Sequence, residues 1–399
     1  MGKICKRASA IIIIMLVFVL SVLVLDFAEN VFGEPDLAEA TMVMDDDVTD
    51  GYKRQHVTNE WESLNQSYIP EYLSGSAVPM DGTNGKANYL VPGLTEDMIP
   101  QGLTYLPEKD WILISSYDKS EKNPSVVFAL DRETGNFVAQ FNLYTADGEP
   151  WKSHAGGVSV SDYNLYVTSD CGVAYFPLSD LDAENGTVKD ISYKATLNFA
   201  QLGKTYSAYI SISDSMLWVG NFYSNSPLSP KLAEWGLIGA DWVWKPNEEY
   251  FNAILGYELS GDSSEEEWAA LESIKDNATK VVNVDNTMDC IQGISFRKLD
   301  DNTYKMYLSR TTGGSLGAAI STATVDLSEN VVCVSEGDFN RNQNLPGAEG
   351  IVFIGDELHI LYESGALSHF EGFFNKLTWN QYLKDCTDVI WKVNASDLA

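Results

Sequence analysis

Short apolar stretches separated by polar turns run along most of this chain, and one arrangement of them recurs five times. In each copy a small residue, usually glycine, opens an apolar stretch, a turn follows, and a second stretch ends in a polar residue. The copies begin Gln101-Gly102-Leu103-Thr104-Tyr105-Leu106, Gly156-Gly157-Val158-Ser159-Val160, Ala208-Tyr209-Ile210-Ser211-Ile212, Gln292-Gly293-Ile294-Ser295-Phe296 and Glu349-Gly350-Ile351-Val352-Phe353. Short stretches rich in β-branched and aromatic residues, bounded by turn residues, predict β-strands.

The copies recur at the spacing of a propeller blade. From Gly102 to Gly157, Tyr209, Gly293 and Gly350 the steps are 55, 52, 84 and 57 residues. A four-stranded blade takes about 40–50 residues, so three steps fit one blade each and the long step fits a blade with insertions. We therefore predict an all-β fold, a five-bladed β-propeller, with a six-bladed ring as the alternative.

The first four copies each supply four predicted strands. These are 103–106, 111–117, 126–130 and 137–143; 158–160, 165–169, 173–178 and 193–199; 209–212, 216–222, 253–259 and 278–284; and 294–296, 305–309, 318–325 and 331–334. The fifth supplies 351–354, 358–363 and 389–393 and lacks one strand. The stretch 88–91, before the first copy, would complete the last blade, and this closes the ring without an open edge.

One short helix is predicted inside the third copy. Trp268, Leu271 and Ile274 follow helical spacing over 265–276. Ser264 and Glu267 before them form a capping box.

Composition fits one large exported domain. The chain has 399 residues, 45% of them hydrophobic, and a net charge of −31 from 57 acidic and 26 basic residues. A surface this acidic repels nucleic acid and anionic lipid, so we expect no nucleic-acid partner. We expect a monomer.

The N-terminus carries an export signal. Lys3, Lys6 and Arg7 precede an apolar run over 10–25. This pattern is typical of a cleaved signal peptide or an uncleaved signal-anchor, and both remain open. We divide the chain into this segment (1–28), an acidic tether (29–87) and the propeller (88–399). The propeller is then extracellular, secreted or anchored to the outer face of the membrane, with membrane contact only through the N-terminal segment.

The cysteine spacing does not determine a disulfide pattern. Cys5 precedes the apolar run, and the four remaining cysteines allow three pairings, with no C-x-x-C spacing that would indicate zinc. Cys333 lies in the apolar run 331–334, where a buried thiol and a disulfide are equally expected.

Polar residues flank the strands at one end of the ring. In a propeller, positions just before the first strands and at the ends of the second strands meet at one mouth of the central channel, which is the default place for a site. The first set is Gln101, His154, Tyr206, Gln292 and Glu349, and the second is Asp118, Asp170, Asn221, Arg310 and Glu363. A solvated polar rim explains these residues as well as a binding site does.

His154 and Glu349 are the candidate catalytic residues. His154 opens a copy before two glycines, and it could act as a general base, a metal ligand or a hydrogen-bond donor. Paired carboxylates for glycoside cleavage could come from Asp118, Asp170, Glu349 and Glu363. The sequence contains no G-x-S-x-G, H-E-x-x-H, phosphate-loop or G-x-G-x-x-G motif.

Two further features point to the same mouth. The four acids just named, with Asn221, form an oxygen-rich set of the kind that Ca²⁺ accepts, although no EF-hand loop is present and the metal stays unknown. The loops 224–252 and 365–387 are rich in aromatic residues and should rise from this face. Such residues can stack on a sugar ring, or they can simply pack against each other.

Four stretches resemble a group of exported bacterial proteins, familiar chiefly from actinobacteria. They are Pro100-Gln101-Gly102-Leu103-Thr104, His154-Ala155-Gly156-Gly157 through Leu165-Tyr166-Val167, Ile291-Gln292-Gly293 and Gly347-Ala348-Glu349-Gly350-Ile351. The likeness runs over most of 98–393, and it implies no activity. More distantly the chain is similar to propellers that include lactonases and phytase-like enzymes. That resemblance implies a metal at the channel mouth and transfers no residue role.

Three functions remain open. The leading hypothesis is a propeller that binds a small-molecule or glycan-like ligand at the channel mouth. The second is a hydrolase of ester, lactone or phosphate substrates, with His154 or Glu349 as base and Ca²⁺ polarising the substrate. The third is a cell-surface module that contacts another protein through the aromatic loops.

Overall fold

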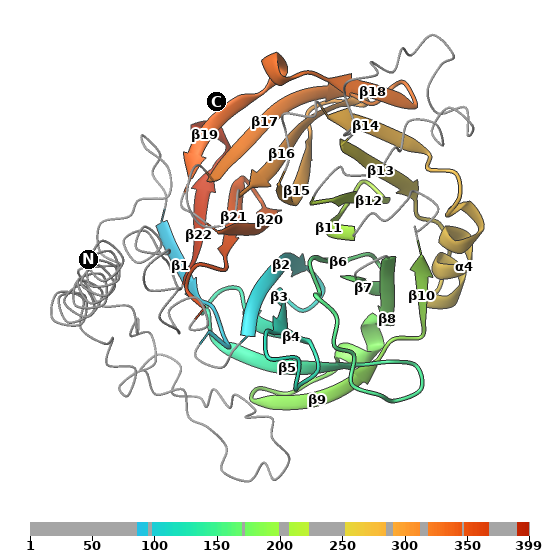
Figure 1. The fold of residues 1–399 in the computed structure, drawn as a ribbon, viewed down its shortest axis with the longest axis vertical. Helices are drawn as coiled ribbons and strands as arrows, with labels where there is room; N and C mark the ends of the chain where they lie inside the picture. The colour runs from blue at the N-terminus through green and yellow to red at the C-terminus, as the bar shows by residue number, and fades with distance from the viewer. Residues whose placement is uncertain are drawn as a thin grey trace, which may run out of the picture.

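The computed structural model describes residues 86–94, 98–169, 172–198, 207–222, 252–284, 290–311, 318–344, 347–366 and 389–398. Their strands form five sheets arranged around a central axis, a five-bladed β-propeller (Figure 1). The innermost strands of neighbouring blades contact one another all the way around this ring. The predicted fold is confirmed. Residues 1–85 lie outside the described part of the chain, and with them the predicted signal or anchor and all but the last two residues of the predicted tether. Those two residues, Lys86 and Ala87, belong to the first strand.

Each blade runs outwards from the axis. Blade one has β2 (Met98–Leu106), β3 (Trp111–Asp118), β4 (Val126–Asp131) and β5 (Phe137–Tyr144); blade two has β6 (Val158–Val160), β7 (Asn164–Ser169), β8 (Gly172–Pro177) and β10 (Ala195–Asn198); blade three has β11 (Ser207–Ser213), β12 (Met216–Asn221), β13 (Asn252–Glu258) and β14 (Lys280–Val284); blade four has β15 (Ile291–Lys298), β16 (Thr303–Arg310), β17 (Ala318–Asp326) and β19 (Asn340–Asn344); blade five has β20 (Ala348–Ile354), β21 (Glu357–Tyr362), β22 (Val389–Asn394) and β1 (Lys86–Leu90).

Strand β1 closes the ring, as predicted. It pairs antiparallel with β22 and so supplies the outer strand of blade five. Its Tyr89 hydroxyl donates to the Arg132 carbonyl of blade one (2.5 Å), and the ring stacks on His359 of blade five (6.3 Å between centroids). The N-terminal strand therefore joins the last blade to the first.

Two strands join sheets to which the repeat does not assign them. The predicted fourth strand of blade four is β18 (Val331–Val334), which instead pairs parallel with β14 of blade three. The polar strand β19 completes blade four. Similarly, β9 (Thr187–Ser192), which the pattern did not predict, pairs parallel with β5 of blade one. The apolar content of 331–334 explains the wrong assignment, because it predicts a strand without saying which sheet that strand joins.

The recurring glycines let neighbouring innermost strands touch backbone to backbone. A Cβ on Gly350 would lie 2.3 Å from the Leu103 nitrogen in the next blade, and one on Gly157 would lie 2.8 Å from the Ile210 nitrogen. In blade three the glycine lies on the second strand and the large residue on the innermost strand. Tyr209 replaces the glycine, and Gly220 on the second strand makes room for it, since a Cβ there would lie 2.2 Å from the Tyr209 hydroxyl oxygen.

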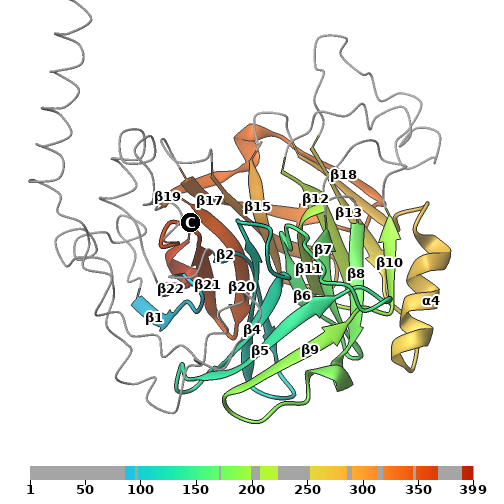
Figure 2. The same ribbon diagram turned by 60° about the horizontal axis from the view of Figure 1, so that its bottom comes forward.

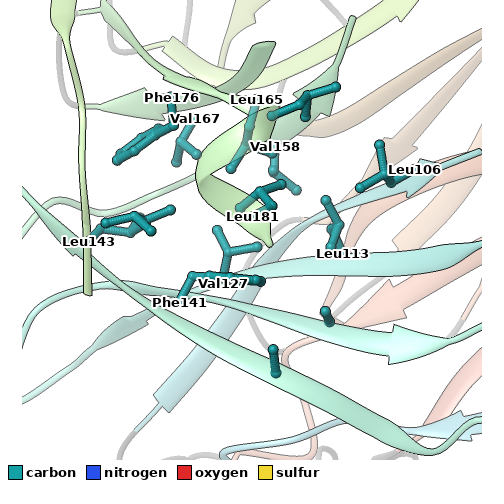
Figure 3. Close-up of a cluster of buried hydrophobic side chains, with 14 of the residues drawn as sticks. Leu106, Leu113, Val127, Phe141, Leu143, Val158, Leu165, Val167, Phe176 and Leu181 are labelled. Atoms are coloured by element: carbon teal, nitrogen blue, oxygen red, sulfur yellow. The ribbon is translucent and has the colours of Figure 1, made fainter. Parts of the chain in front are cut away.

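Apolar side chains fill the space between blades. Figure 3 shows Phe141 and Val127 of blade one facing Val167 and Phe176 of blade two, all fully or almost fully buried. Burial of apolar area of this kind is the main favourable contribution to folding.

Helix α4 (Ser264–Ile274) lies against the outside of the ring near β10 (Figures 1 and 2). Trp268 stacks on Tyr175 of blade two (4.4 Å between centroids). Its buried Glu267 accepts hydrogen bonds from Asn164 (2.9 Å) and from two hydroxyl groups of blade two. The N-cap is Ser263, whose side chain accepts from the Glu266 nitrogen, so the predicted capping box was one residue late.

Two smaller findings complete the fold. Cys333 is an exposed free thiol on β18, so the expectation of a buried thiol or a disulfide there was wrong. Among the described residues, no helix has the length and apolarity needed to cross a membrane.

Candidate ligand site at the bulge face

The ring has two chemically different ends. At one end the innermost strands begin and the second strands stop, and we call this the bulge face. At the other end each innermost strand turns into its second strand, and we call this the hairpin face.

A β-bulge near the start of an innermost strand gives the bulge face its name. The pairing of β2 with β3 skips Gln101, and that of β15 with β16 skips Gln292. The register of β20 with β21 shifts in the same place, between Ala348 and Ile351, around Glu349. A bulge kinks the strand and redirects the extra side chain. The repeated Gln or Glu before the glycine is therefore a bulge residue.

Glu349 is the buried centre of this face. Its side chain is fully buried, and its Oε1 accepts a hydrogen bond from Gln292 Nε2 (2.9 Å). Within the described part of the chain, Oε2 has no hydrogen-bond partner. Burial, and next the charge of Glu363, raise the pKa of Glu349 well above its usual value, and the Gln292 bond opposes this only in part. Glu349 is thus biased towards the neutral acid.

Glu363 supplies the second carboxyl group. It is half-buried and follows β21 directly, and its backbone nitrogen donates to the Gly347 carbonyl (2.9 Å). Gln101 Nε2 donates to Glu363 Oε2 (3.4 Å) and to the Pro100 carbonyl (2.9 Å). Two bulge residues from different blades therefore hold the two carboxyl groups.

Tyr117 joins this group, although the sequence pattern did not single it out. Burial first, and then the charges of Glu363 and Glu349, raise the pKa of its hydroxyl. His154 stacks on its ring, with 4.4 Å between centroids. Because His154 is exposed and Tyr117 half-buried opposite Ile99, the pair presents an aromatic surface at the bulge face.

The pairing register explains why Tyr117 was missed. Ser116, Asn221, Arg310 and Tyr362 all pair with the residue before a bulge. The residue after each of these is the true equivalent of Glu363, and in blade one this is Tyr117. Asp118 lies one residue after this equivalent position, and Asn221 and Arg310 each lie one residue before it. A one-residue offset moves a side chain to the opposite face of a strand.

Asp118 has a structural role instead. Its carboxylate accepts from the nitrogen and hydroxyl of Ser120 (2.8 and 2.6 Å), from the Lys122 nitrogen (3.1 Å), and from the nitrogen and side chain of Asn123 (both 2.8 Å). It folds the loop after β3, which is the usual work of an Asp in a turn.

The other predicted residues are only partly visible. Asp170 and Tyr206 lie outside the described residues, and so does nearly all of both aromatic loops. For Asn221 the backbone alone is described, and Arg310 is half-buried at the end of β16. Among the described side chains no group of three or more His, Cys, Asp or Glu is placed to hold a metal. The calcium site stays a prediction, now without Asp118.

The hairpin face carries satisfied charges. Asp214 of blade three accepts from the Tyr304 hydroxyl (2.6 Å) and pairs with Lys298 (3.2 Å), both of blade four. Asp356 of blade five pairs with Arg297 of blade four. In blade one, Asp110 accepts two hydrogen bonds from Arg132 (2.5 and 3.0 Å) and one from Tyr105 (2.6 Å).

No protein-family model and no curated protein matches this chain. Similar solved structures include a glutaminyl cyclase from Myxococcus xanthus (TM-score 0.37, 9% identity, covering 70% of this chain and 91% of that one). A second is an exo-β-1,3-galactanase from Phanerochaete chrysosporium (TM-score 0.37, 12% identity, covering 79% of this chain and 64% of that one). A third is the tail fibre of Staphylococcus aureus phage P68 (TM-score 0.39, 9% identity, covering 85% of this chain and 56% of that one).

With TM-scores below 0.5, these likenesses carry no argument about fold or function. The chain spans less than two thirds of the galactanase and tail-fibre chains. The resemblance to exported proteins of the actinobacterial type gains no support from them and stays a prediction.

Proposed function

We propose that this propeller binds a small, uncharged, hydrogen-bonding ligand at its bulge face. The observation that carries the proposal is Glu349. A fully buried carboxyl group with one oxygen unpartnered among the described residues is costly, because a buried polar atom without a hydrogen bond loses its hydration without replacement. A ligand oxygen that accepts from the neutral acid would remove that cost.

The neighbours of Glu349 favour a polyhydroxylated ligand such as a sugar. Gln101 and Gln292 carry amide groups, Glu363 carries acceptor oxygens, and Tyr117 with His154 forms an aromatic surface. Hydroxyl groups of a sugar can both donate and accept, and its C–H face packs on aromatic rings. The overall charge of −31 and the two carboxyl groups disfavour an anionic ligand.

Binding to neutral mono- and disaccharides, measured by titration calorimetry, tests the proposal. Glu349→Leu removes both hydrogen-bonding oxygens and should weaken binding by about 10-fold or more, the usual effect of one lost buried hydrogen bond. Glu267→Leu is the matched control, since Glu267 of α4 is also buried but accepts hydrogen bonds from the β6–β7 hairpin, away from the bulge face. Unchanged binding in Glu349→Leu, or no binding of any of these sugars, would contradict the proposal.

The export signal over 10–25 lies outside the described residues. With it, we propose that binding takes place outside the cell, on a secreted or membrane-anchored propeller.

A further inference from the structure

We propose that Glu349 and Glu363 act as an acid–base pair that hydrolyses a glycosidic bond in the bound ligand. This inference rests on the proposed function, because the ligand must first occupy the bulge face. It goes further by giving the two carboxyl groups separate chemical roles.

The two residues follow the paired residues Ala348 and Tyr362 of blade five, and their carboxyl groups have different surroundings. Glu349 is fully buried, whereas Glu363 is half-buried and accepts a hydrogen bond from Gln101. Burial favours the neutral acid, while hydrogen bonds and solvent favour the carboxylate. Two carboxyl groups whose environments differ in this way are suited to acid and base roles at one pH.

The position of the acidic proton follows from Gln292. Its Nε2 donates to Glu349 Oε1 at 2.9 Å, so Oε1 is already an acceptor. The proton of the neutral acid therefore lies on Oε2, the oxygen without a partner among the described residues. A general acid needs a proton that is not committed to another acceptor, and the Oε2 proton has no acceptor among the described residues.

The reaction is balanced with water as the only co-reactant. Glu349 transfers the Oε2 proton to the glycosidic oxygen, and the bond from that oxygen to the anomeric carbon breaks. The Glu363 carboxylate accepts a proton from a water molecule, whose oxygen bonds to the anomeric carbon. Exchange with solvent then returns a proton to Glu349 and removes one from Glu363. Glycoside hydrolysis by two carboxyl groups follows this scheme in general.

The substrate class follows from the charges around the pair. An anionic glycoside would meet the carboxylate of Glu363 in a protein of net charge −31. A neutral glycoside avoids this repulsion. Tyr117 and His154 supply an aromatic surface at the same face, against which its sugar ring would lie.

The test uses the full chain with a panel of neutral aryl and alkyl glycosides. Nitrophenyl and methyl glycosides of glucose, galactose, mannose, xylose and arabinose differ in how much their leaving groups need protonation. Glu349→Gln should lower turnover by about 10²–10⁴-fold for methyl glycosides, and much less for nitrophenyl glycosides. Glu363→Gln should lower turnover of both kinds. Sugar binding should persist in both Gln variants, and Glu267→Gln should leave turnover unchanged.

The outcomes separate this inference from the proposed function. Sugar binding without turnover of any glycoside would overturn the hydrolysis and leave the binding site intact. Absence of binding as well would overturn both. Equal losses for nitrophenyl and methyl glycosides in Glu349→Gln would overturn its role as the acid, because a merely structural effect does not depend on the leaving group.

Discussion

Acidic side chains on the two faces of the ring differ in burial and in hydrogen bonding. On the hairpin face Asp214 and Asp356 lie in exposed turns and pair with cations of blade four. On the bulge face Glu349 is fully buried, receives one hydrogen bond and has a second oxygen unpartnered in the described structure. Satisfied ion pairs join blades, whereas an unsatisfied buried acid weakens a fold. The requirements of folding therefore explain the charged residues of the hairpin face, but they do not explain the buried acid of the bulge face.

The same contrast appears in the backbone. Glycines of the bulge face make room for contact between blades, whereas a hairpin-face glycine such as Gly355 lies in an open turn with φ +63°. Added side-chain atoms should therefore disrupt packing at the bulge-face glycines, and they should be accommodated at a hairpin-face glycine such as Gly355.

The largest expected effect tests that contrast with one added methyl group. Gly350→Ala would place Cβ 2.3 Å from a backbone nitrogen of blade one, and this atom cannot move alone. We expect a loss of about 4 kcal/mol or more, or no folded protein. Gly355→Ala has nothing within 4 Å and should cost about 1–2 kcal/mol for its left-handed conformation. Denaturant unfolding measures both, and similar losses would show that the two faces do not differ in packing.

A smaller effect concerns Glu349 and pH. Because its folded-state pKa lies above the unfolded value of 4.5, its contribution to stability is lost as pH rises from there through the folded pKa. Glu349→Gln should therefore stabilise the protein at pH 7, by about 1–2 kcal/mol, and have little effect below pH 4. Thermal unfolding of both proteins across this range measures the difference. A stability gain independent of pH would show that Glu349 is not buried as an acid.

The smallest effect concerns Asp214, where the sign is reversed. The Tyr304 hydrogen bond first, and then Lys298, lower its pKa below 3.8, so its contribution is present above that pH and lost as pH falls through the folded pKa. Because the pair is largely exposed, Asp214→Asn should cost at most about 1 kcal/mol at pH 7, and less in high salt. A larger loss that salt does not reduce would mean that the hairpin face depends on more than solvent-screened pairs.

The architecture could be predicted because its signals are repetitive. Regular spacing identified the blades, and the leftover stretch 88–91 identified the closing strand, since a ring leaves no place for an unpaired apolar edge. The exchange of β18 for β19 could not be predicted. Apolar, β-branched content predicts a strand over 331–334 without saying which sheet it joins, while the polar strand β19 gives almost no signal of its own.

The candidate site could be predicted only to the nearest residue. The pattern found Gln101, Gln292, Glu349 and Glu363, because each stands at a fixed distance from a repeated glycine or strand end. It selected Asp118 and not Tyr117, because it took the polar residue at the end of the predicted strand 111–117 and the bulge shifts the register by one. The sequence around Asp118 did contain the opposing signal, since Ser120 and Asn123 are typical partners of an Asp that caps a turn.

Strands β9 and β18 link neighbouring blades, so a single blade is not an independent unit of unfolding. Each is encoded between strands of one blade and completes the sheet of the blade before it. Blades one and two, and blades three and four, are thereby interlocked, and β1 ties blade five to the start of the chain. A linear repeat protein can unravel one module at a time from its ends. Here opening blade two also removes β9 from blade one, and opening blade four removes β18 from blade three. Hydrogen exchange should therefore report these interlocked pairs of blades, rather than single repeats, as the cooperative units.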